Sequence, residues 1–230
     1  MRQYDAILID ADDTLFDFAQ AEHVALTWLL DTLQLNTERA RACYHACNRA
    51  CWAALEKGEI DQARLRYKRF EDFFRAMDVS GDPIKIADGY MALLSRQGML
   101  LSGALAAVRE IAREVPVAVV TNGISFIQHG RMDASPLRPY VSAFVISEEL
   151  GVAKPHPKMI SAALKLLGGV SPTRALMVGD SIPSDLYCAR NAGTDACWYN
   201  PSGAPRPKDV PIRYEISALA QLPALALIQT

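Results

Sequence analysis

Six short apolar runs, separated by segments of helical pattern, place the tightest limit on how this chain can fold. The runs are rich in β-branched residues and bounded by turn or polar residues, which is typical of strands buried on both faces. Strands and helices in alternation predict an α/β fold with a mainly parallel, doubly wound sheet. The predicted strands are residues 6–9, 115–120, 143–146, 175–178, 196–199 and, more weakly, 212–216; the predicted helices between them are residues 104–113, 156–167 and 184–191.

The pattern changes over residues 18–97, where apolar positions fall at helical spacing and no convincing strand occurs. This stretch predicts an inserted domain that forms a small four-helix bundle. Asn36 is the predicted N-cap of a helix that Gly58 ends, and Asp82 before Pro83 predicts the start of the fourth helix. The helical spacing is carried by Val24 with Trp28 and by Phe70, Phe73, Phe74 and Met77.

Length and charge limit the classes of function. At 230 residues the chain is long for one domain and short for two, which fits a core of residues 1–17 and 98–230 carrying an insertion, residues 18–97. The 24 Lys and Arg against 26 Asp and Glu give a net charge of −2, so we expect no nucleic-acid polymer as partner. No stretch approaches the roughly 18 apolar residues that span a bilayer, so we expect no membrane partner and a cytoplasmic location.

The five cysteines are an odd number without a predicted export signal, which predicts free thiols rather than a disulfide framework. Cys43, Cys47 and Cys51 recur every four residues, so on a helix they form one stripe. Three thiolates could hold a metal ion. Free cysteine is commonly buried, so the stripe favours packing inside the helical domain.

Carboxylates follow the first predicted strand directly. Asp10 and Asp12 are two residues apart, so while the chain stays extended they point to one side. Ligands of open α/β sheets bind at this end of the strands. Two neighbouring carboxylates commonly have separated pKa values, so one can act as a nucleophile while the other carries a proton. Acidic residues after a strand can also be simple turn formers and helix caps.

A second acidic cluster favours the catalytic interpretation. Asp180 follows the fourth predicted strand, and Asp185 lies five residues later. If the two strands are adjacent, Asp10, Asp180 and Asp185 converge, and unpaired carboxylates so close repel one another unless a cation lies among them. Oxygen-only ligands predict Mg²⁺.

Two further strand ends carry residues that suit a phosphoryl group. Thr121, Asn122 and Gly123 follow the second run, and Lys154 precedes Pro155 after the third. A hydroxyl, exposed backbone N–H groups and a lysine are groups that bind phosphate oxygens. Each feature alone is an ordinary turn or helix approach, so the specificity lies in their order and location.

The haloacid dehalogenase superfamily has four successive motifs, and this sequence resembles all of them in order: Asp10-x-Asp12-x-Thr14, Thr121-Asn122-Gly123, Lys154-Pro155, and Gly179-Asp180 with Asp185. The resemblance implies a Rossmann-like core with an inserted helical cap, Mg²⁺ as cofactor and a phosphoaspartate intermediate. It implies Asp10 as the nucleophile and Asp12 as the general acid and base. The other implied roles are phosphate binding by Thr121, Asn122 and Lys154, metal binding by Asp10, Asp12 and Asp180, and support from Thr14, Gly123 and Asp185.

Within that superfamily the chain is similar to the bacterial pyrimidine 5′-nucleotidases. The resemblance implies a small phosphorylated substrate, a pyrimidine nucleoside monophosphate such as dUMP, dTMP or UMP. Trp52 and Arg69 are then candidates for stacking on or hydrogen bonding to the base, although residues of each type are more often packed or salt-bridged. The similar segments are residues 10–16, 146–155 and 197–200, with Trp52, Gly58, Ile60, Arg69 and Phe70 in the insertion.

Other readings stay open because the insertion otherwise diverges from that family. A phosphatase with the same type of cap could act on a sugar phosphate or phosphoglycolate, and a phosphosugar mutase would have the same core. A dehalogenase would need neither Asp12 nor Mg²⁺, so Asp12 and Asp180 argue against it. An inactive phosphate-binding module would be expected to lack a motif residue, and none is missing. The sequence leaves the oligomeric state open.

Overall fold

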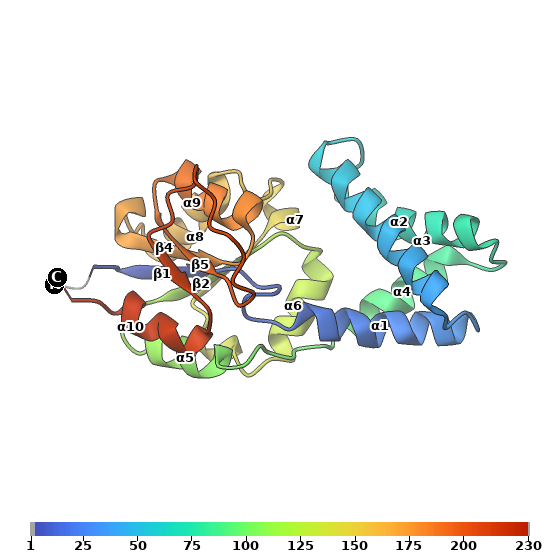
Figure 1. Cartoon of the computed structure of the whole chain (residues 1–230), viewed down its shortest axis with the longest axis horizontal. Helices are drawn as coiled ribbons and strands as arrows, with labels where there is room; N and C mark the ends of the chain where they lie inside the picture. The colour runs from blue at the N-terminus through green and yellow to red at the C-terminus, as the bar shows by residue number, and fades with distance from the viewer. Residues whose placement is uncertain (1–2, 230) are drawn as a thin grey trace. The chain divides into compact units, whose positions relative to one another are not determined.

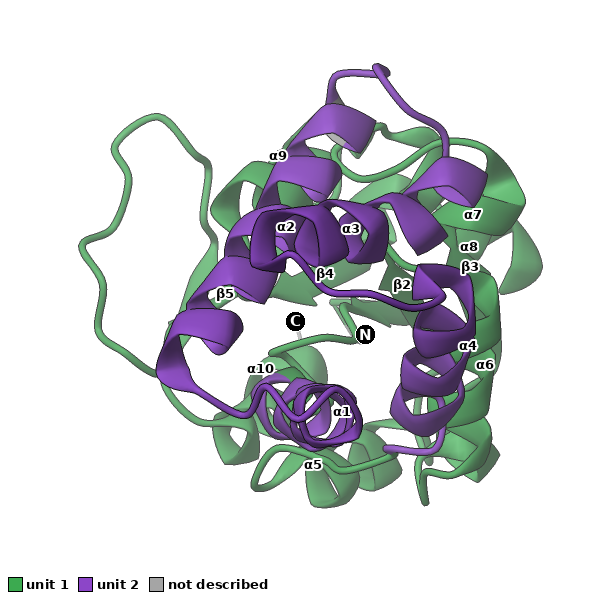
Figure 2. Ribbon diagram, turned by 90° about the vertical axis from the view of Figure 1, so that its right-hand side faces the viewer, with its two compact units in different colours: residues 1–18, 98–230 green, residues 19–97 purple. Residues whose placement is uncertain are grey.

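The structure, a computed structural model, describes residues 3–229 and divides into two compact units, coloured separately in Figure 2. Unit 1 comprises Met1–Phe18 and Gly98–Thr230, and unit 2 comprises Ala19–Gln97. Unit 2 therefore differs from the predicted insertion only in the placement of Phe18. Residues 1, 2 and 230 of the predicted core lie outside the described residues.

Unit 1 is built on one sheet whose neighbouring strands are all parallel (Figure 1). The strand order is β3-β2-β1-β4-β5-β6, so the direction of winding reverses between β1 and β4. The predicted α/β fold with a parallel sheet is confirmed. The strands are β1 (Ala6–Ile9), β2 (Val117–Thr121), β3 (Ala143–Ile146), β4 (Ala175–Gly179), β5 (Asp195–Tyr199) and β6 (Tyr214–Ile216).

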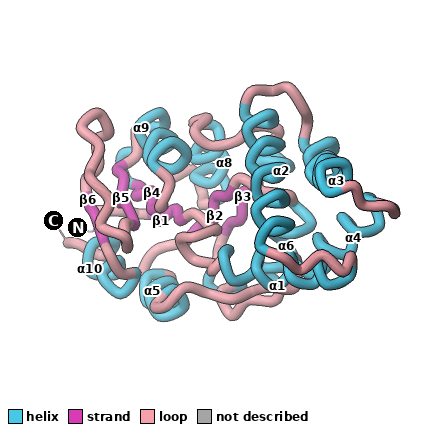
Figure 3. Tube along the Cα trace, turned by 45° about the vertical axis from the view of Figure 1, so that its right-hand side comes forward, coloured by secondary structure: helices cyan, strands magenta, loops and turns pink. Residues whose placement is uncertain are grey.

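Alternate residues of the strands enter two different hydrophobic cores. Ile7 and Ile9 belong to the core that α5 and α10 cover, whereas Ala6 and Leu8 belong to the core that α8 and α9 cover (Figure 3). Burial on both faces explains why the strands read as continuous apolar runs. The helical segments are α5 (Ala104–Ile111), α6 (Ser125–Asp133), α7 (Ser147–Leu150), α8 (Lys158–Leu166), a π-helix (Ile182–Leu186), α9 (Tyr187–Ala192) and α10 (Leu222–Ala226), with short 3₁₀ turns at Arg138–Tyr140, Pro172–Arg174 and Leu219–Gln221.

Two strands begin two residues later than predicted, and in each case a local hydrogen bond explains the shift. The N–H of Val115 donates to the carbonyl of Ile111 at 3.0 Å, so this apolar residue closes the turn that follows α5 and does not join β2. The N–H of Ile212 donates to the carbonyl of Val210 at 2.9 Å, which makes a turn before β6. Hydrophobicity alone does not reveal which backbone partner such a residue takes.

Unit 2 is helical, which confirms the predicted four-helix insertion. Its core is aromatic: the rings of Tyr44 and Tyr90 have centroids 5.5 Å apart, and those of Phe70 and Tyr90 are 5.2 Å apart. In residues 3–229, no helix combines the length and the apolar character needed to cross a membrane. The helices are α1 (Phe18–Thr32), α2 (Glu38–Glu56), α3 (Gln62–Met77) and α4 (Pro83–Leu94).

The predicted N-cap of α2 is wrong by one residue. The side chain of Thr37, not that of Asn36, accepts a hydrogen bond from the N–H of Ala40, at 3.2 Å. The amide of Asn36 instead donates to Asp31 at 2.7 Å and accepts from Arg41 at 2.7 Å. Asparagine and threonine are both good caps, so two in succession leave the sequence ambiguous by one position.

Candidate active site

Asp10 lies immediately after β1, in the middle of the sheet, and is 7% exposed. Its backbone N–H donates to the carbonyl of Val178 in β4 at 2.9 Å, which continues the parallel pairing past the end of β1. The ammonium group of Lys154 donates to the Asp10 carboxylate and, at 2.9 Å, to the carbonyl of Val120. The predicted nucleophile and a predicted phosphate-binding group are therefore in direct contact.

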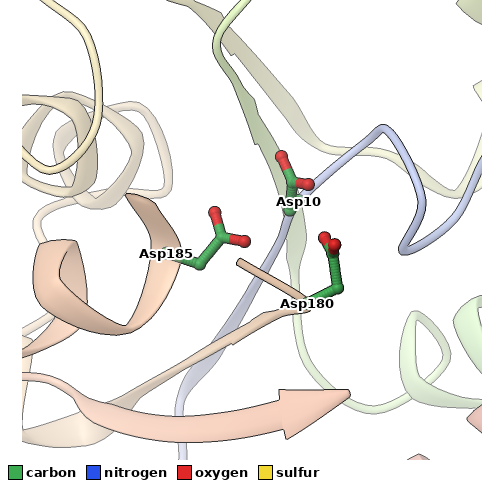
Figure 4. A group of neighbouring side chains, drawn as sticks. All are labelled: Asp10, Asp180 and Asp185. Carbon is green, nitrogen blue, oxygen red and sulfur yellow. The ribbon is translucent and has the colours of Figure 1, made fainter. Parts of the chain in front are cut away.

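Three carboxylates gather at the carboxyl ends of β1 and β4 (Figure 4). One oxygen from each of Asp10, Asp180 and Asp185 lies within 4.8 Å of the others. Asp180 directly follows β4, and Asp185 comes from the π-helix after it. The ammonium of Lys154 also donates to Oδ1 of Asp185 at 2.6 Å. The structure thus brings together the three acidic residues that the sequence placed near one another.

Thr14 fixes the position of Asp180. Its hydroxyl, which is fully buried, donates to Oδ1 of Asp180 at 3.1 Å and accepts from the N–H of Asp180 at 3.1 Å. The indole N–H of Trp198 donates to the carbonyl of Asp180 at 2.9 Å. Backbone and side chain of Asp180 are therefore held from both sides. The sequence motif included Thr14, whereas nothing in it pointed to Trp198 in this position.

Gly179 allows Asp185 to approach β4. A Cβ atom at this position would lie 2.2 Å from Oδ2 of Asp185, far inside van der Waals contact. The same oxygen accepts from the N–H of Ser181 at 3.0 Å, so moving it away from Gly179 would weaken this hydrogen bond. The glycine before Asp180 is therefore needed for space.

Asn122 holds the backbone of Lys154 through both atoms of its amide. Nδ2 donates to the carbonyl of Lys154 at 2.9 Å, and Oδ1 accepts from the N–H of Lys154 at 2.7 Å. This contact joins Lys154, in the segment after α7, to the loop that follows β2. The predicted role of Asn122 in binding phosphate stays a prediction, and in this structure its side chain is engaged in positioning Lys154.

Asp12 lies apart from the three gathered carboxylates and contacts two residues of α6 that sequence reasoning missed. Arg131 donates to Oδ1 of Asp12, and Gln128 donates to Oδ2 at 2.7 Å. Gln128 also donates to the hydroxyl of Thr121 at 3.0 Å. The predicted metal role of Asp12 stays a prediction. A Gln and an Arg three residues apart on a helix are common on protein surfaces, so nothing in the sequence distinguished this pair.

The electrostatics of the site follow from its burial. Burial, and after it the carboxylate of Asp185, raises the pKa of Asp10 well above its usual value. Burial also raises the pKa of Asp180, again with a contribution from Asp185. For Lys154, burial favours the neutral amine, but the carboxylates of Asp10 and Asp185 outweigh it and raise its pKa. One ammonium therefore faces three crowded carboxylates.

The residues present fit a hard divalent cation. The gathered donors are all carboxylate oxygens, which suit Mg²⁺. The raised pKa values of Asp10 and Asp180 reflect charges that lack enough compensation, and a cation among these oxygens would supply it. Asp10, Asp180 and Asp185 are the residues that would hold the ion.

Comparison with known families assigns the chain. Its sequence matches the haloacid dehalogenase-like hydrolases over residues 4–193, which includes β1 and every acidic residue described above. This chain belongs to that hydrolase family. The family recognised from the four motifs is thus confirmed, and the chain is an enzyme of the hydrolase class.

The relatives of this haloacid dehalogenase-like hydrolase cover nearly its whole length. The pyrimidine 5′-nucleotidase YjjG of Escherichia coli is 31% identical over 223 residues, which cover 97% of this chain and 98% of the relative. The pyrimidine 5′-nucleotidase PynA of Streptococcus pneumoniae is 37% identical over 200 residues, covering 86% and 84%. A crystal structure of the HAD-hydrolase YfnB of Bacillus subtilis, bound to magnesium, matches with a TM-score of 0.87 and 28% identity, covering 99% of this chain and 100% of that one.

The two predicted base-contacting residues of this hydrolase, Trp52 and Arg69, lie in unit 2. Arg69 is 4% exposed; it donates to Oδ1 of Asn48 at 2.9 Å and stacks on the rings of Phe70 and Tyr90. Trp52 is half-buried. These contacts give Arg69 a packing role within unit 2, and the base-binding roles of both residues stay predictions.

Proposed function

We propose that this hydrolase is a magnesium-dependent phosphomonoesterase that forms a phosphoaspartate on Asp10, and that its substrates are pyrimidine nucleoside 5′-monophosphates such as dUMP, dTMP and UMP. The observation that carries the chemistry is the contact of the buried Asp10 carboxylate with Lys154, beside Asp180 and Asp185. A lone buried carboxylate would be protonated and a poor nucleophile, whereas this one lies against a fixed positive charge.

In the first half-reaction a carboxylate oxygen of Asp10 bonds to phosphorus while the bond from phosphorus to the ester oxygen breaks. Asp12 gives its proton to the departing oxygen, which leaves as an alcohol. Lys154 and the hydroxyl of Thr121 bind the phosphoryl oxygens as their charge shifts. A bound Mg²⁺ would supply charge neutralisation for the phosphate dianion and the carboxylate that approaches it.

In the second half-reaction water attacks the phosphorus of the acyl phosphate and restores the Asp10 carboxylate. Asp12, now ionised, accepts the proton of that water, so it ends the cycle as it began. Phosphate-monoester hydrolysis without a catalyst is among the slowest known reactions, with enzymatic enhancements of up to about 10²¹. Nucleophile, proton carrier and charge neutralisation must therefore act together.

The substrate class rests on the relatives named as pyrimidine 5′-nucleotidases, which align over most of this chain. The groups around Asp10 would contact only the phosphoryl group, so they would accept any monoester alike. We infer that discrimination among leaving groups comes from residues of unit 2.

A side-by-side assay tests this function. With Mg²⁺ present, we expect dUMP, dTMP and UMP to have higher kcat/KM than AMP, glucose 6-phosphate and phosphoglycolate. If glucose 6-phosphate or phosphoglycolate exceeds every pyrimidine nucleotide, the substrate class is wrong while the phosphatase chemistry stands. If no ester releases phosphate, the phosphatase chemistry is wrong as well.

A further inference from the structure

Arg131 and Gln128 form an unusual polar pair in the interior of unit 1. Arg131 has no exposed surface, and Gln128 is 3% exposed. They lie three residues apart on α6, on the same side of that helix. Each uses its polar end to reach the carboxylate of Asp12, Arg131 at Oδ1 and Gln128 at Oδ2. Arginine is seldom fully buried, and here its charge meets an acidic residue of the predicted catalytic motif.

The guanidinium of Arg131 is held by more than Asp12. It lies over the ring of Phe16, with its central carbon 4.8 Å from the ring centroid, and 5.5 Å from the centroid of Phe18. It also lies 3.5 Å from Oε1 of Gln128. Stacking on aromatic faces restricts a planar guanidinium. The group that holds Asp12 is therefore itself fixed by packing.

Gln128 connects Asp12 to Thr121. Its amide nitrogen has two protons, and its two acceptors are Oδ2 of Asp12 at 2.7 Å and the hydroxyl of Thr121 at 3.0 Å. Its oxygen faces Arg131, which can only donate, so this orientation of the amide is the satisfied one. A hydroxyl that accepts from Gln128 keeps its own proton for another acceptor. The hydroxyl proton of Thr121 is therefore the one that it can donate toward the site.

Gly123 leaves the space that this arrangement needs. A Cβ atom at position 123 would lie 2.5 Å from Nε2 of Gln128 and 2.8 Å from its Cγ. The N–H of Gly123 donates to the hydroxyl of Ser147 at 3.1 Å, which fixes the loop at this separation. The glycine that follows Thr121 and Asn122 therefore makes room for Gln128.

We propose that Arg131 and Gln128 are positioning residues that hold the Asp12 carboxylate in its working orientation and set Thr121 as a hydrogen-bond donor. The inference rests on the proposed phosphatase function. Each carboxylate oxygen of Asp12 has two lone pairs, and one lone pair accepts the hydrogen bond from Arg131 or Gln128. The second lone pair remains for the proton that Asp12 must carry. A carboxylate fixed in this way is already oriented toward the ester oxygen, and later toward the water, so the reaction loses no side-chain rotamer entropy at that step.

The first test replaces Gln128 with methionine, which has a similar length but cannot donate. We expect the kcat of Gln128→Met on dUMP to fall roughly 10- to 100-fold, since a small misplacement of a catalytic group has effects of this size. With p-nitrophenyl phosphate, whose leaving group needs little protonation, the loss in the burst rate, which reports the first half-reaction, should be at least threefold smaller than with dUMP. Met132→Leu is the matched control, because Met132 is a buried residue of α6 that packs in the apolar core. It should retain wild-type kcat on both substrates. Equal losses in the burst rate on both substrates in Gln128→Met would overturn the role of Gln128 in holding Asp12.

The second test is a double-mutant cycle between Arg131 and Asp12. Arg131→Met should lower kcat by roughly 10- to 100-fold in the wild type, but by less than about threefold in the Asp12→Asn background, because Arg131 acts through Asp12. Arg131→Lys, which keeps the charge but not the planar fork, should recover part of the loss. Losses that multiply in the double variant would show that Arg131 acts independently of Asp12 and would overturn the proposal. If Arg131→Met does not fold, the Gln128→Met comparison decides the matter.

A crystal structure of Gln128→Met separates this inference from the proposed function. We expect the Asp12 carboxylate to turn away from its wild-type position, whether or not the enzyme accepts nucleotides. If the wild type hydrolyses no phosphate ester, the proposed function fails, and the position of Asp12 in the variant still tests the holding role. An unmoved Asp12 carboxylate in that crystal overturns the inference even if the wild type is an active nucleotidase.

Discussion

Two aspartates flank β1, and only one of them lies at the site. Asp10 follows the strand and is buried, whereas Asp5 precedes it, is exposed and pairs with Arg174 at 2.7 Å. Asp10→Asn should abolish turnover, because an amide is a poor nucleophile. Asp5→Asn is the matched control and should keep wild-type kcat. Thermal unfolding of Asp10→Asn should stay within a few degrees of the wild type, since Lys154 keeps Asp185 as a partner. Substantial turnover by Asp10→Asn would mean that another group attacks phosphorus.

Asp12 should show its role through the leaving group. Asp12→Asn can neither protonate the ester oxygen nor activate water, so we expect kcat on dUMP to fall by about 10² to 10⁴. The first half-reaction of p-nitrophenyl phosphate should suffer less, because its leaving group is stable as an anion. Burst kinetics on both substrates measure that step separately from dephosphorylation. Equal losses in the burst rate would remove Asp12 as the leaving-group acid.

At the level of single residues, the sequence predicted the carboxylates, the lysine and the motif residues Thr14 and Asn122 that hold Asp180 and Lys154, but not the pair that holds Asp12. Asp10, Asp180 and Asp185 stand at strand ends in recognisable motifs, and the structure gathers them. Arg131 and Gln128 belong to no such pattern, because their meaning depends on where α6 packs. That packing depends on many distant contacts, which local sequence does not encode.

The segment that joins β4 to its π-helix depends on close packing at Gly179. Gly179→Ala would push a methyl group into the carboxylate of Asp185, so we expect at least a tenfold loss of kcat together with a lower melting temperature. Gly193 offers a contrast, because it ends α9 at φ 73° with nothing within 4 Å of an added Cβ. Gly193→Asn should change stability by less than about 1 kcal/mol, since asparagine tolerates this conformation. A fully active Gly179→Ala would contradict the close approach.

Three thiols of this chain, Cys47, Cys188 and Cys197, should be poorly reactive in the native state. Burial raises the pKa of Cys188 and of Cys197 to about 12. Burial, and after it the neighbouring Cys43, raises the pKa of Cys47 to about 11, so at pH 8 only about one such thiol in a thousand is ionised. An aromatic disulfide reagent should therefore label Cys47, Cys188 and Cys197 slowly in the native protein and label all five cysteines after denaturation. Rapid native labelling of Cys188 or Cys197 would contradict their burial.

At the level of elements, periodicity predicted the six strands, the helices of unit 2 and the core helices α5, α8 and α9, and missed where some of them begin. One hydrogen bond decides each of two boundaries that the sequence missed. The bond of Val115 to Ile111 delays the start of β2, and the bond of Thr37 to Ala40 sets the N-cap of α2. Residues beside a strand or helix are compatible with either state, so the choice is made by the backbone partner available in the folded chain. The short α6 was not predicted, because its nine residues mix polar and apolar types without a clear period.

Unit 2 should carry substrate preference if the proposed function is right. Trp52→Ala should change the ranking of dUMP against AMP and glucose 6-phosphate, while leaving hydrolysis of p-nitrophenyl phosphate within about threefold of the wild type. Trp28→Phe serves as the control, since Trp28 packs against Gly89 within unit 2. An unchanged ranking would mean that the base is recognised by other residues.

For the whole molecule, removal of divalent cations should stop catalysis. Without a cation the phosphate dianion must approach three carboxylates, two of which share the ammonium group of Lys154, and this is strongly unfavourable. We expect no turnover in excess EDTA and recovery on adding Mg²⁺. Full activity in EDTA would exclude a metal-dependent mechanism.

The central claim is that Asp10 becomes phosphorylated during turnover. Its most direct test is to mix enzyme, Mg²⁺ and dUMP, quench with acid within one turnover and analyse the peptide that contains Asp10 by mass spectrometry. We expect this peptide to gain one phosphoryl group on Asp10 and Asp12→Asn to accumulate it for longer. We further expect the gain to be lost in EDTA and in Asp10→Asn. Release of phosphate in a single turnover with no phosphorylated Asp10, in both the wild type and Asp12→Asn, would contradict the account.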